Sequence, residues 1–297
     1  MNTNLPDATR NTSLFGGLSG RFRKPAAPLQ PKTPLVVAIH GGTYTSAYFD
    51  VPGASLLDRA EANGIPIVAP DRPGYVDSAM LPGAEGTIGG QATALTHALH
   101  DAWTHFGEGT CGMVLIGHSI GGAIAATIAS DPRGLPLIGL AVSGVGMLTP
   151  PEHQPMWEAL PDLPIVEIPA EAKAGFMFGP EGSFDPGMPA LSTKVAGTGA
   201  PRAELVDIVS TWSARAPSVL GRITVPVHYR QAEIDHLWIC GRRQVDDFAH
   251  ALSAAARVDA AMVAGTGHCM DFHHVGRSLQ LQQLAFALQC AAQAPPR

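Results

Sequence analysis

At 297 residues, 45% of them hydrophobic and 15% charged, the chain is long enough to bury a large core. The formal net charge of -6 and the scattered basic residues exclude an electrostatic surface for nucleic acid, so no nucleic-acid partner is expected. No run approaches the roughly 20 apolar residues of a membrane span, and the N-terminus lacks the apolar core of a signal peptide, which favours a cytoplasmic protein.

The N-terminal segment, residues 1 to about 34, shows little periodic pattern. A short hairpin is expected around residues 14–22, and the prolines that follow predict an extended lead-in. Residues 35–39 are an apolar run of strand length that opens directly into the glycine-rich loop of residues 40–43, His-Gly-Gly-Thr. A strand that ends in this way can present backbone N–H groups of Gly42 or Thr43 to a negatively charged oxygen. We expect His40 to brace the loop through bonds to neighbouring backbone.

The next segments alternate between helix and strand patterns. Residues 54–63 predict a helix ended by Gly64, and residues 65–69 predict a strand. Thr87 is expected to cap a second helix, because the apolar residues after it recur three or four positions apart and share one face. This alternation favours a mostly parallel sheet covered by helices on both sides.

The most informative motif is Gly117-His118-Ser119-Ile120-Gly121. An apolar run of strand length, residues 111–116, precedes it, and a small-residue helix, residues 122–130, follows. A serine in such a turn stands clear of the sheet in a strained backbone position, which is the form of a nucleophile elbow. The alternative is an ordinary glycine-lined turn in which Ser119 caps the helix. We favour Ser119 as a nucleophile, with the Ile120 N–H facing the reacting oxygen.

A stretch of different character separates the predicted strand of residues 137–143 from the one at residues 223–230. Residues 149–221 are repeatedly broken by proline and carry interleaved aromatic and methionine residues, with short helices expected near residues 170–178 and 203–214. We expect Trp157, Phe176 and Phe178 to line an apolar pocket. The alternative is that such side chains only hold this segment to the core.

The candidate acid and base follow the last two predicted strands. Asp235 lies a few residues past the strand of residues 223–230, and His268 follows the strand of residues 258–263 on a Gly-Thr-Gly-His loop. His268 is the best general base, and Asp235 would fix the tautomer of its imidazole. Glu233 is the second candidate for the acid, because one position either way decides which side chain faces the histidine.

Other histidines and the cysteines show no metal-binding pattern. His97 and Asp101 are spaced as a two-ligand clip on the second helix, but no third ligand is evident, and His273 and His274 are expected to be loop or helix-start residues. Cys111, Cys240, Cys269 and Cys290 show no paired spacing. We therefore expect no metal, no cofactor and no disulfide, and we expect Cys269, beside the candidate base, to be an ordinary buried thiol.

Taken together, these motifs resemble those of the α/β-hydrolase-fold serine hydrolases that carry a cap. The resemblance runs from about residue 35 to the C-terminus through the oxyanion loop, Asp71-Arg72-Pro73-Gly74, the elbow, Asp235 and Gly265 to His268. It departs at Ala232 and Val76, where such families often carry glycine. It implies a doubly wound, mostly parallel α/β sheet formed by residues 1–148 and 222–297, with a helical cap inserted at residues 149–221.

The resemblance also implies an activity. The expected reaction is cleavage of a carboxylic ester, thioester or lactone of a small apolar substrate, with Ser119 as nucleophile, His268 as base and Asp235 as the orienting acid. The elbow serine disfavours the dehalogenases and epoxide hydrolases of this fold, which use an aspartate there. Two alternatives remain open: a carbon–carbon bond hydrolase, lyase or cyclase on the same scaffold, or a binding protein that has kept the pocket without the chemistry.

Overall fold

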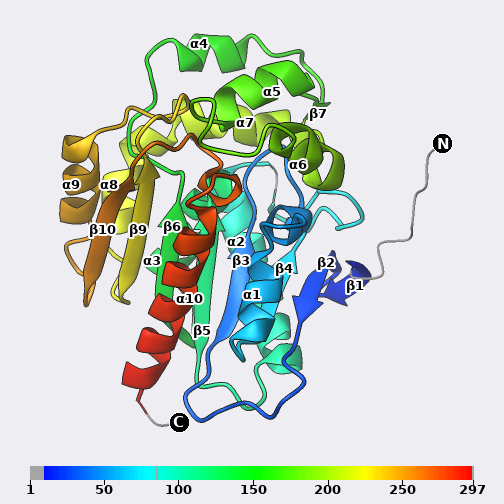
Figure 1. The fold of residues 1–297 in the computed structure, drawn as a ribbon, viewed down its shortest axis with the longest axis vertical. Helices are drawn as coiled ribbons and strands as arrows, with labels where there is room; N and C mark the ends of the chain where they lie inside the picture. The colour runs from blue at the N-terminus through cyan, green and yellow to red at the C-terminus, as the bar shows by residue number, and fades with distance from the viewer. Residues whose placement is uncertain (1–9, 85, 296–297) are drawn as a thin grey trace.

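One eight-stranded sheet forms the centre of the molecule (Figure 1). The computed structural model describes residues 10–84 and 86–295. The strand order across the sheet is β1-β2-β4-β3-β5-β6-β9-β10. In chain order the strands are β1 (Arg10–Phe15), β2 (Leu18–Arg23), β3 (Leu35–Ile39), β4 (Ile67–Pro70), β5 (Met113–His118), β6 (Leu137–Ser143), β9 (Val227–Ala232) and β10 (Val258–Val263). A separate two-stranded ribbon pairs β7 (Ile165–Val166) with β8 (Ala200–Pro201).

From β4 to β10 in this order, all strands run parallel to one another, whereas β2 pairs in antiparallel fashion with both β1 and β4. The predicted mostly parallel sheet is therefore confirmed. In register, Ile39 of β3 pairs with Gly117 of β5, and His118 pairs with Ser143 of β6. The segments that leave these strands consequently emerge at the same edge of the sheet, where ligands of parallel sheets bind.

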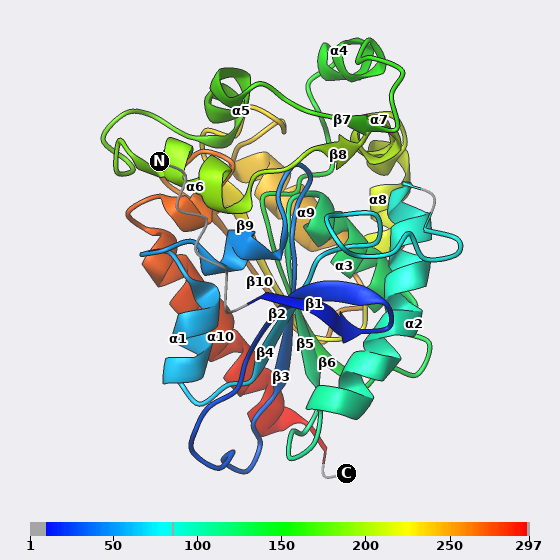
Figure 2. The same ribbon diagram turned by 90° about the vertical axis from the view of Figure 1, so that its right-hand side faces the viewer.

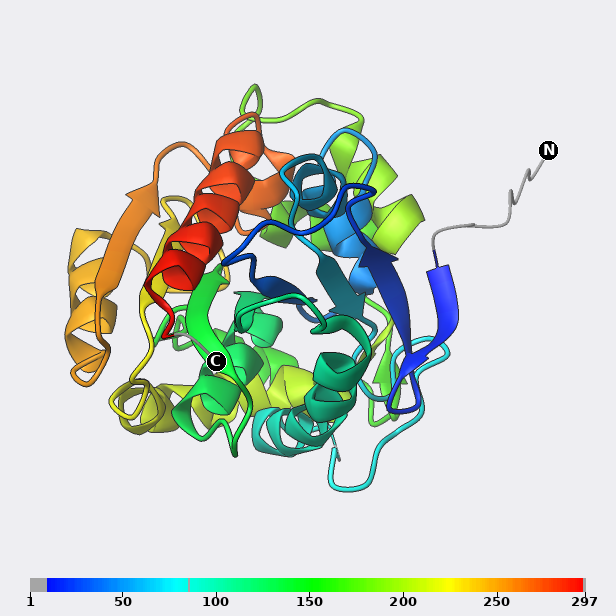
Figure 3. The same ribbon diagram turned by 90° about the horizontal axis from the view of Figure 1, so that it is seen from below.

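Helices cover both faces of this sheet, as the end-on views show (Figures 2 and 3). One face carries α1 and α10, and the other carries α2, α3, α8 and α9. Their bounds are α1 (Leu56–Ala62), α2 (Ile88–Phe106), α3 (Ile120–Ser130), α8 (Trp212–Leu220), α9 (Arg242–Ala251) and α10 (Gly276–Gln293), and two short 3-10 helices span Ser46–Asp50 and Met270–Phe272. The predicted cap of α2 is confirmed, because the Thr87 hydroxyl accepts a bond from the Gly90 N–H. Every residue of β3 and β5 is buried, which explains why parallel strands read as continuous apolar runs.

Four short helices lie across the carboxyl ends of the strands (Figures 1 and 2). We call residues 149–211 the cap segment, and its helices are α4 (His153–Glu158), α5 (Ala170–Met177), α6 (Met188–Ala196) and α7 (Arg202–Ser210). The helix predicted at residues 203–214 is in fact two helices, α7 and α8, which meet at Thr211. Trp212 begins α8 fully buried and donates a hydrogen bond to the Gly146 carbonyl oxygen. Because α8 packs on α3 and α9 beside the sheet, it does not cover the strand ends.

The N-terminal hairpin lies at the edge of the sheet. The hairpin predicted around residues 14–22 is confirmed as β1 and β2, and Gly16 and Gly17 at its turn both have positive φ angles. Residues 1–9, at the start of the segment with little periodic pattern, lie outside the described residues. None of the helices in residues 10–84 and 86–295 is long and apolar enough to cross a membrane.

Candidate active site

Ser119 stands at a tight turn between β5 and α3. Its φ of 56° and ψ of -128° place a non-glycine residue in a strained region of backbone space. The neighbouring glycines make the turn possible: a Cβ on Gly121 would lie 2.2 Å from the Ile39 carbonyl oxygen, and one on Gly117 would lie 2.6 Å from the Gly121 carbonyl oxygen. Both positions of the Gly-x-Ser-x-Gly motif therefore require glycine for steric reasons.

The three candidate catalytic side chains form one continuous hydrogen-bonded chain. Ser119 Oγ lies 2.8 Å from His268 Nε2, and His268 Nδ1 lies 2.8 Å from Asp235 Oδ2. The side chains of His268 and Asp235 are 1% and 0% exposed. The other carboxylate oxygen of Asp235 accepts a bond from the Leu237 N–H at 2.9 Å, which fixes the carboxylate. With Nδ1 donating to Asp235, the Nε2 lone pair faces the Ser119 hydroxyl, and the serine makes no bond as a helix cap.

Glu233, the second candidate for the acid, occupies a different place. Its Oε2 accepts a hydrogen bond from the Gly265 N–H at 2.8 Å, so it supports the loop that carries His268. Ala232, where glycine was expected from the resemblance, is the buried last residue of β9 and pairs with Val263. The departure at Ala232 therefore leaves the position of Asp235 undisturbed.

The candidate oxyanion groups face the same cavity as Ser119. Gly42, Thr43 and Ile120 all line it together with the serine. Ile120 is the first residue of α3, where the N–H groups of a helix have no intrahelical acceptor and carry its positive dipole end. Thr43 has a φ of 61°, so the backbone of the oxyanion loop turns sharply at this point. A Cβ on Gly41 would lie 2.8 Å from Ser119 Cβ, which explains why this loop reads His-Gly-Gly.

His40 and Arg72 hold the oxyanion loop in place. The backbone N–H of Arg72 donates to His40 Nε2 at 3.0 Å, so His40 Nδ1 carries the proton and donates to the Gly41 carbonyl oxygen at 2.8 Å. The Arg72 guanidinium donates to the carbonyl oxygens of His40 and Gly41 at 2.9 and 3.1 Å. Burial, and then the Arg72 charge, hold the pKa of His40 well below its usual value. The predicted bracing role of His40 is confirmed.

A residue of the cap segment completes this network. Glu204 on α7 receives two bonds from the Arg72 guanidinium, at 2.7 and 2.9 Å, and a third from the Tyr75 hydroxyl. The side chains of Arg72 and Glu204 are both fully buried. Burial alone would lower the pKa of Arg72, but the Glu204 carboxylate raises it above its usual value. The oxyanion loop is thus tied to the cap segment through a buried ion pair.

A second cap residue contacts the loop directly. Lys173 on α5 is 3% exposed, donates to the Thr43 carbonyl oxygen at 2.6 Å, and lies 3.5 Å from the centre of the Tyr44 ring. Burial lowers the pKa of Lys173 to about 8, an effect opposed by the neighbouring Cys269. Sequence reasoning missed both Lys173 and Glu204, because each acts through a contact between segments far apart in the chain.

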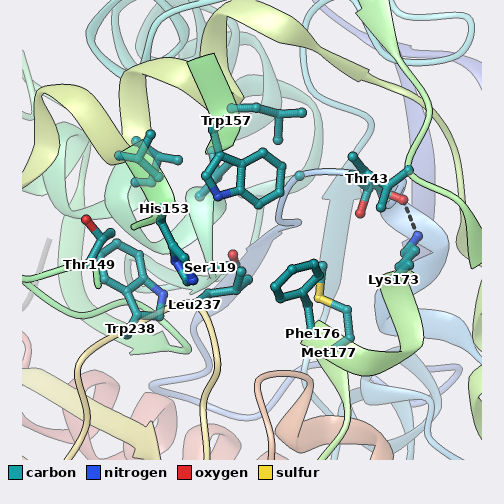
Figure 4. Close-up of a pocket in the computed structure, with 16 residues that line it drawn as sticks. Thr43, Ser119, Thr149, His153, Trp157, Lys173, Phe176, Met177, Leu237 and Trp238 are labelled. Carbon is teal, nitrogen blue, oxygen red and sulfur yellow. Dashed lines mark hydrogen bonds between the residues drawn. The ribbon is translucent and has the colours of Figure 1, made fainter. Parts of the chain in front are cut away.

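An open cavity lies above Ser119 (Figure 4). Its walls are mainly apolar, and Trp157 and Phe176 line it as expected. Phe178 was predicted to do the same but lies elsewhere, with its ring 4.9 Å from Phe184 and 6.2 Å from Phe272. The reason is that α5 ends at Met177 and Phe178 continues in extended backbone, which turns its side chain away. Residues that the sequence analysis did not single out also line the cavity: Thr149, His153, Ile168, Met177, Leu205, Ile208, Val209, Leu237 and Trp238.

His273 and Cys269, which lie near the site, have structural roles. His273 Nε2 accepts bonds from the Gly179 and Gly267 N–H groups, at 3.0 and 3.1 Å, and so joins the cap segment to the loop before His268. Burial raises the pKa of the Cys269 thiol well above its usual value, so this fully buried side chain stays protonated at neutral pH. Within the described part of the chain, no three His, Cys, Asp or Glu side chains gather in a way that fits a metal ion.

Comparisons with known proteins agree with this architecture. The sequence matches the alpha/beta hydrolase family over residues 36–277, whereas no curated protein matches it. Among solved structures, an esterase from Thermogutta terrifontis is similar with a TM-score of 0.66 and 17% identity, covering 92% of this chain and 94% of that one. A monoacylglycerol lipase from Paleococcus ferrophilus has a TM-score of 0.61 and 16% identity over 92% and 99% of the two chains. A 2-hydroxy-6-oxo-6-phenylhexa-2,4-dienoate hydrolase from Rhodococcus has a TM-score of 0.64 and 20% identity over 94% and 97%. The chain therefore belongs to the alpha/beta hydrolase family.

Proposed function

We propose that this protein is a serine hydrolase that cleaves a carboxylic ester, thioester or lactone of a small apolar substrate through an acyl-enzyme. One observation carries the proposal: the hydrogen-bonded chain from Ser119 through His268 to Asp235 opens into an apolar cavity that ends at the serine hydroxyl. A nucleophile, a base and an orienting carboxylate at these distances are what acyl transfer requires.

The first half of the reaction forms the acyl-enzyme. Ser119 Oγ attacks the substrate carbonyl carbon while His268 Nε2 takes the hydroxyl proton, and the carbonyl π electrons move to oxygen. The resulting oxyanion accepts bonds from the Ile120 N–H and from the N–H of Gly42 or Thr43. When this intermediate collapses, the bond to the alcohol or thiol breaks, and His268 gives the leaving group its proton.

The second half of the reaction releases the acid. His268 Nε2 removes a proton from water, whose oxygen attacks the acyl carbon, and a second oxyanion forms in the same place. Its collapse breaks the bond to Ser119 Oγ, which recovers the proton from His268. Asp235 remains ionised throughout and stabilises the imidazolium in each half. This scheme uses only groups of the chain and water.

The similar solved structures support this substrate class, since they include esterases and lipases. The dienoate hydrolase among them favours a second candidate, a carbon–carbon bond hydrolase on the same scaffold. The two candidates share Ser119 and His268 but differ in the bond that breaks. A non-catalytic binding protein is disfavoured because the strained backbone of Ser119 has no evident use in binding alone.

The test is a substrate panel run beside a covalent probe. We expect a fluorophosphonate to label the wild-type protein, and we expect p-nitrophenyl esters, thioesters or lactones to be turned over faster than vinylogous diketones. Labelling with turnover of only the diketones would favour the carbon–carbon hydrolase. If the protein is not labelled and turns over none of the substrates, the result would favour a binding protein.

A further inference from the structure

The helix α4 of the cap segment places two side chains with buried ring nitrogens in the wall of the cavity. His153 and Trp157 are four residues apart, so they lie on the same face of α4. They are its buried side chains, 6% and 9% exposed, whereas the other residues of the helix are exposed. Both rings line the cavity and point into it beside Ser119 (Figure 4). The helix therefore contributes one indole and one imidazole to the wall of the cavity.

The buried nitrogens of these rings have no partner within the described residues. Trp157 Nε1 and His153 Nδ1 are inaccessible and make no hydrogen bond to the chain. This is unlike Trp212 and Trp238, which donate to the carbonyl oxygens of Gly146 and Gly144. A buried N–H group without an acceptor is costly, and buried polar groups are nearly always paired. Because both rings line the cavity, an atom of the substrate could supply the hydrogen-bond partner that the chain does not.

We propose that His153 and Trp157 form a polar subsite that binds a neutral oxygen atom, a hydroxyl or keto group, on the substrate and away from the scissile bond. This inference rests on the proposed function and specifies its substrate class. The indole nitrogen only donates, so the substrate atom must be an acceptor, and His153 Nδ1 can donate to a keto oxygen or accept from a hydroxyl.

The surroundings favour a neutral group over a carboxylate. A buried carboxylate needs a cation, and the lysine of this cavity, Lys173, already donates to the Thr43 carbonyl oxygen and lies over the Tyr44 ring. The side chains next to the subsite are aromatic: Phe176 has its ring centre 6.3 Å from those of both His153 and Trp157. The substrate is thus an ester whose apolar chain carries one uncharged oxygen.

The experiment compares matched esters in matched variants. The substrates are p-nitrophenyl hexanoate, its hydroxy and oxo derivatives at successive carbons, and the adipate half-ester as the charged member. The variants are Trp157→Phe, which removes the N–H but keeps a ring, and Phe176→Leu as a control that changes cavity volume without removing a polar atom.

We expect the wild type to prefer one hydroxy or oxo ester over hexanoate by roughly tenfold in kcat/KM, the effect of one neutral hydrogen bond. Trp157→Phe abolishes that preference, measured as the ratio of the two kcat/KM values within each variant, whereas Phe176→Leu keeps it. Preference for the adipate half-ester would overturn the neutral subsite, and an unchanged preference in Trp157→Phe would overturn the role of the indole.

A binding measurement separates this proposal from the proposed function. Calorimetry with the Ser119→Ala variant compares methyl hydroxyhexanoate and methyl oxohexanoate with methyl hexanoate, and it needs no turnover. Tighter binding of an oxygenated ester, lost in Ser119→Ala/Trp157→Phe, would support the subsite even if no ester is hydrolysed. Equal binding of all three esters would overturn the subsite even if hexanoate is hydrolysed well.

Discussion

Asp235 and Glu233 both form hydrogen bonds to the loop that carries His268, but they bond to different groups. Asp235 bonds the imidazole itself, whereas Glu233 bonds the backbone of Gly265. We expect Asp235→Asn to lower kcat by about ten-thousandfold, because an amide at this position favours the wrong imidazole tautomer. Glu233→Gln should cost less than about tenfold, since its amide oxygen can still accept the Gly265 bond. Steady-state kinetics on one ester decide the matter, and the reverse ranking would make Glu233 the orienting acid.

Lys173 links protonation to stability. Its pKa is about 8 in the folded protein, because of burial, against an ordinary value of 10.5. Between these values the unfolded chain binds more protons than the folded one, so stability rises with pH over this window. Below about pH 8 both states are protonated, and the cost of burying the ammonium is fully present.

We therefore expect the wild type to gain stability relative to Lys173→Met as the pH rises from about 8 to about 10, by up to a few kcal/mol. Urea unfolding of both proteins across this pH range measures the difference between their free energies of unfolding. Groups that titrate in both proteins contribute equally to the two values and cancel in this difference. A difference that stays constant with pH would show that the folded protein leaves the pKa of Lys173 unshifted.

At the scale of elements, the cap segment and the oxyanion loop are joined by the Arg72–Glu204 pair. Glu204→Gln leaves the Arg72 charge buried with no carboxylate, so we expect a loss of roughly 3–5 kcal/mol of stability. We also expect kcat to fall, because the same guanidinium holds the His40 and Gly41 carbonyl groups. Glu171→Gln, an exposed change in the same segment, is the control and should be near neutral. Thermal unfolding that is alike for both variants would contradict a structural role for the pair.

The two phenylalanines at the end of α5 should behave differently. Phe176 lines the cavity, so Phe176→Ala is expected to shift the preferred acyl length and change discrimination by about 1–3 kcal/mol. Phe178 packs against Phe184 and Phe272, so Phe178→Ala is expected to cost roughly 3–5 kcal/mol of stability with the same acyl preference. Acyl-length profiles measured beside melting temperatures separate the two roles. A changed acyl-length profile in Phe178→Ala would show that the Phe178 ring contacts the substrate, contrary to this account.

At the scale of the whole molecule, the parallel strands were the easiest part to predict. Strands such as β3 are buried on both faces, so they appear in the sequence as uninterrupted apolar runs. The strand boundaries were predicted less accurately than the strands themselves. The apolar run predicted a strand at residues 111–116, whereas β5 spans Met113–His118 and is therefore shifted by two residues at each end. The break between α7 and α8 was missed, because the Trp212 contact with Gly146 that fixes it is a tertiary one.

The residues of the candidate site also differ in how far the sequence could predict their roles. Ser119 and Gly121 could be identified from the sequence because their roles depend on local backbone geometry, where a side chain on the glycine would collide with the next strand. Lys173 and Glu204 could not, since each matters only through a contact with a distant loop. The separation of Asp235 from Glu233 also needed the structure, because the chain leaves β9 by a turn whose direction the sequence does not specify.

The most direct test of the central claim is intact-protein mass spectrometry after treatment with a fluorophosphonate. We expect one adduct per wild-type chain, located on Ser119 by peptide mapping, and loss of both the adduct and ester turnover in Ser119→Ala and His268→Ala. Both variants should keep their fold, because each substitution truncates one side chain in the connection that follows a strand. Losing a member of such a triad usually lowers the rate by several orders of magnitude. An adduct on another residue, or more than a few per cent of activity in either folded variant, would contradict the assignment of Ser119 as the nucleophile.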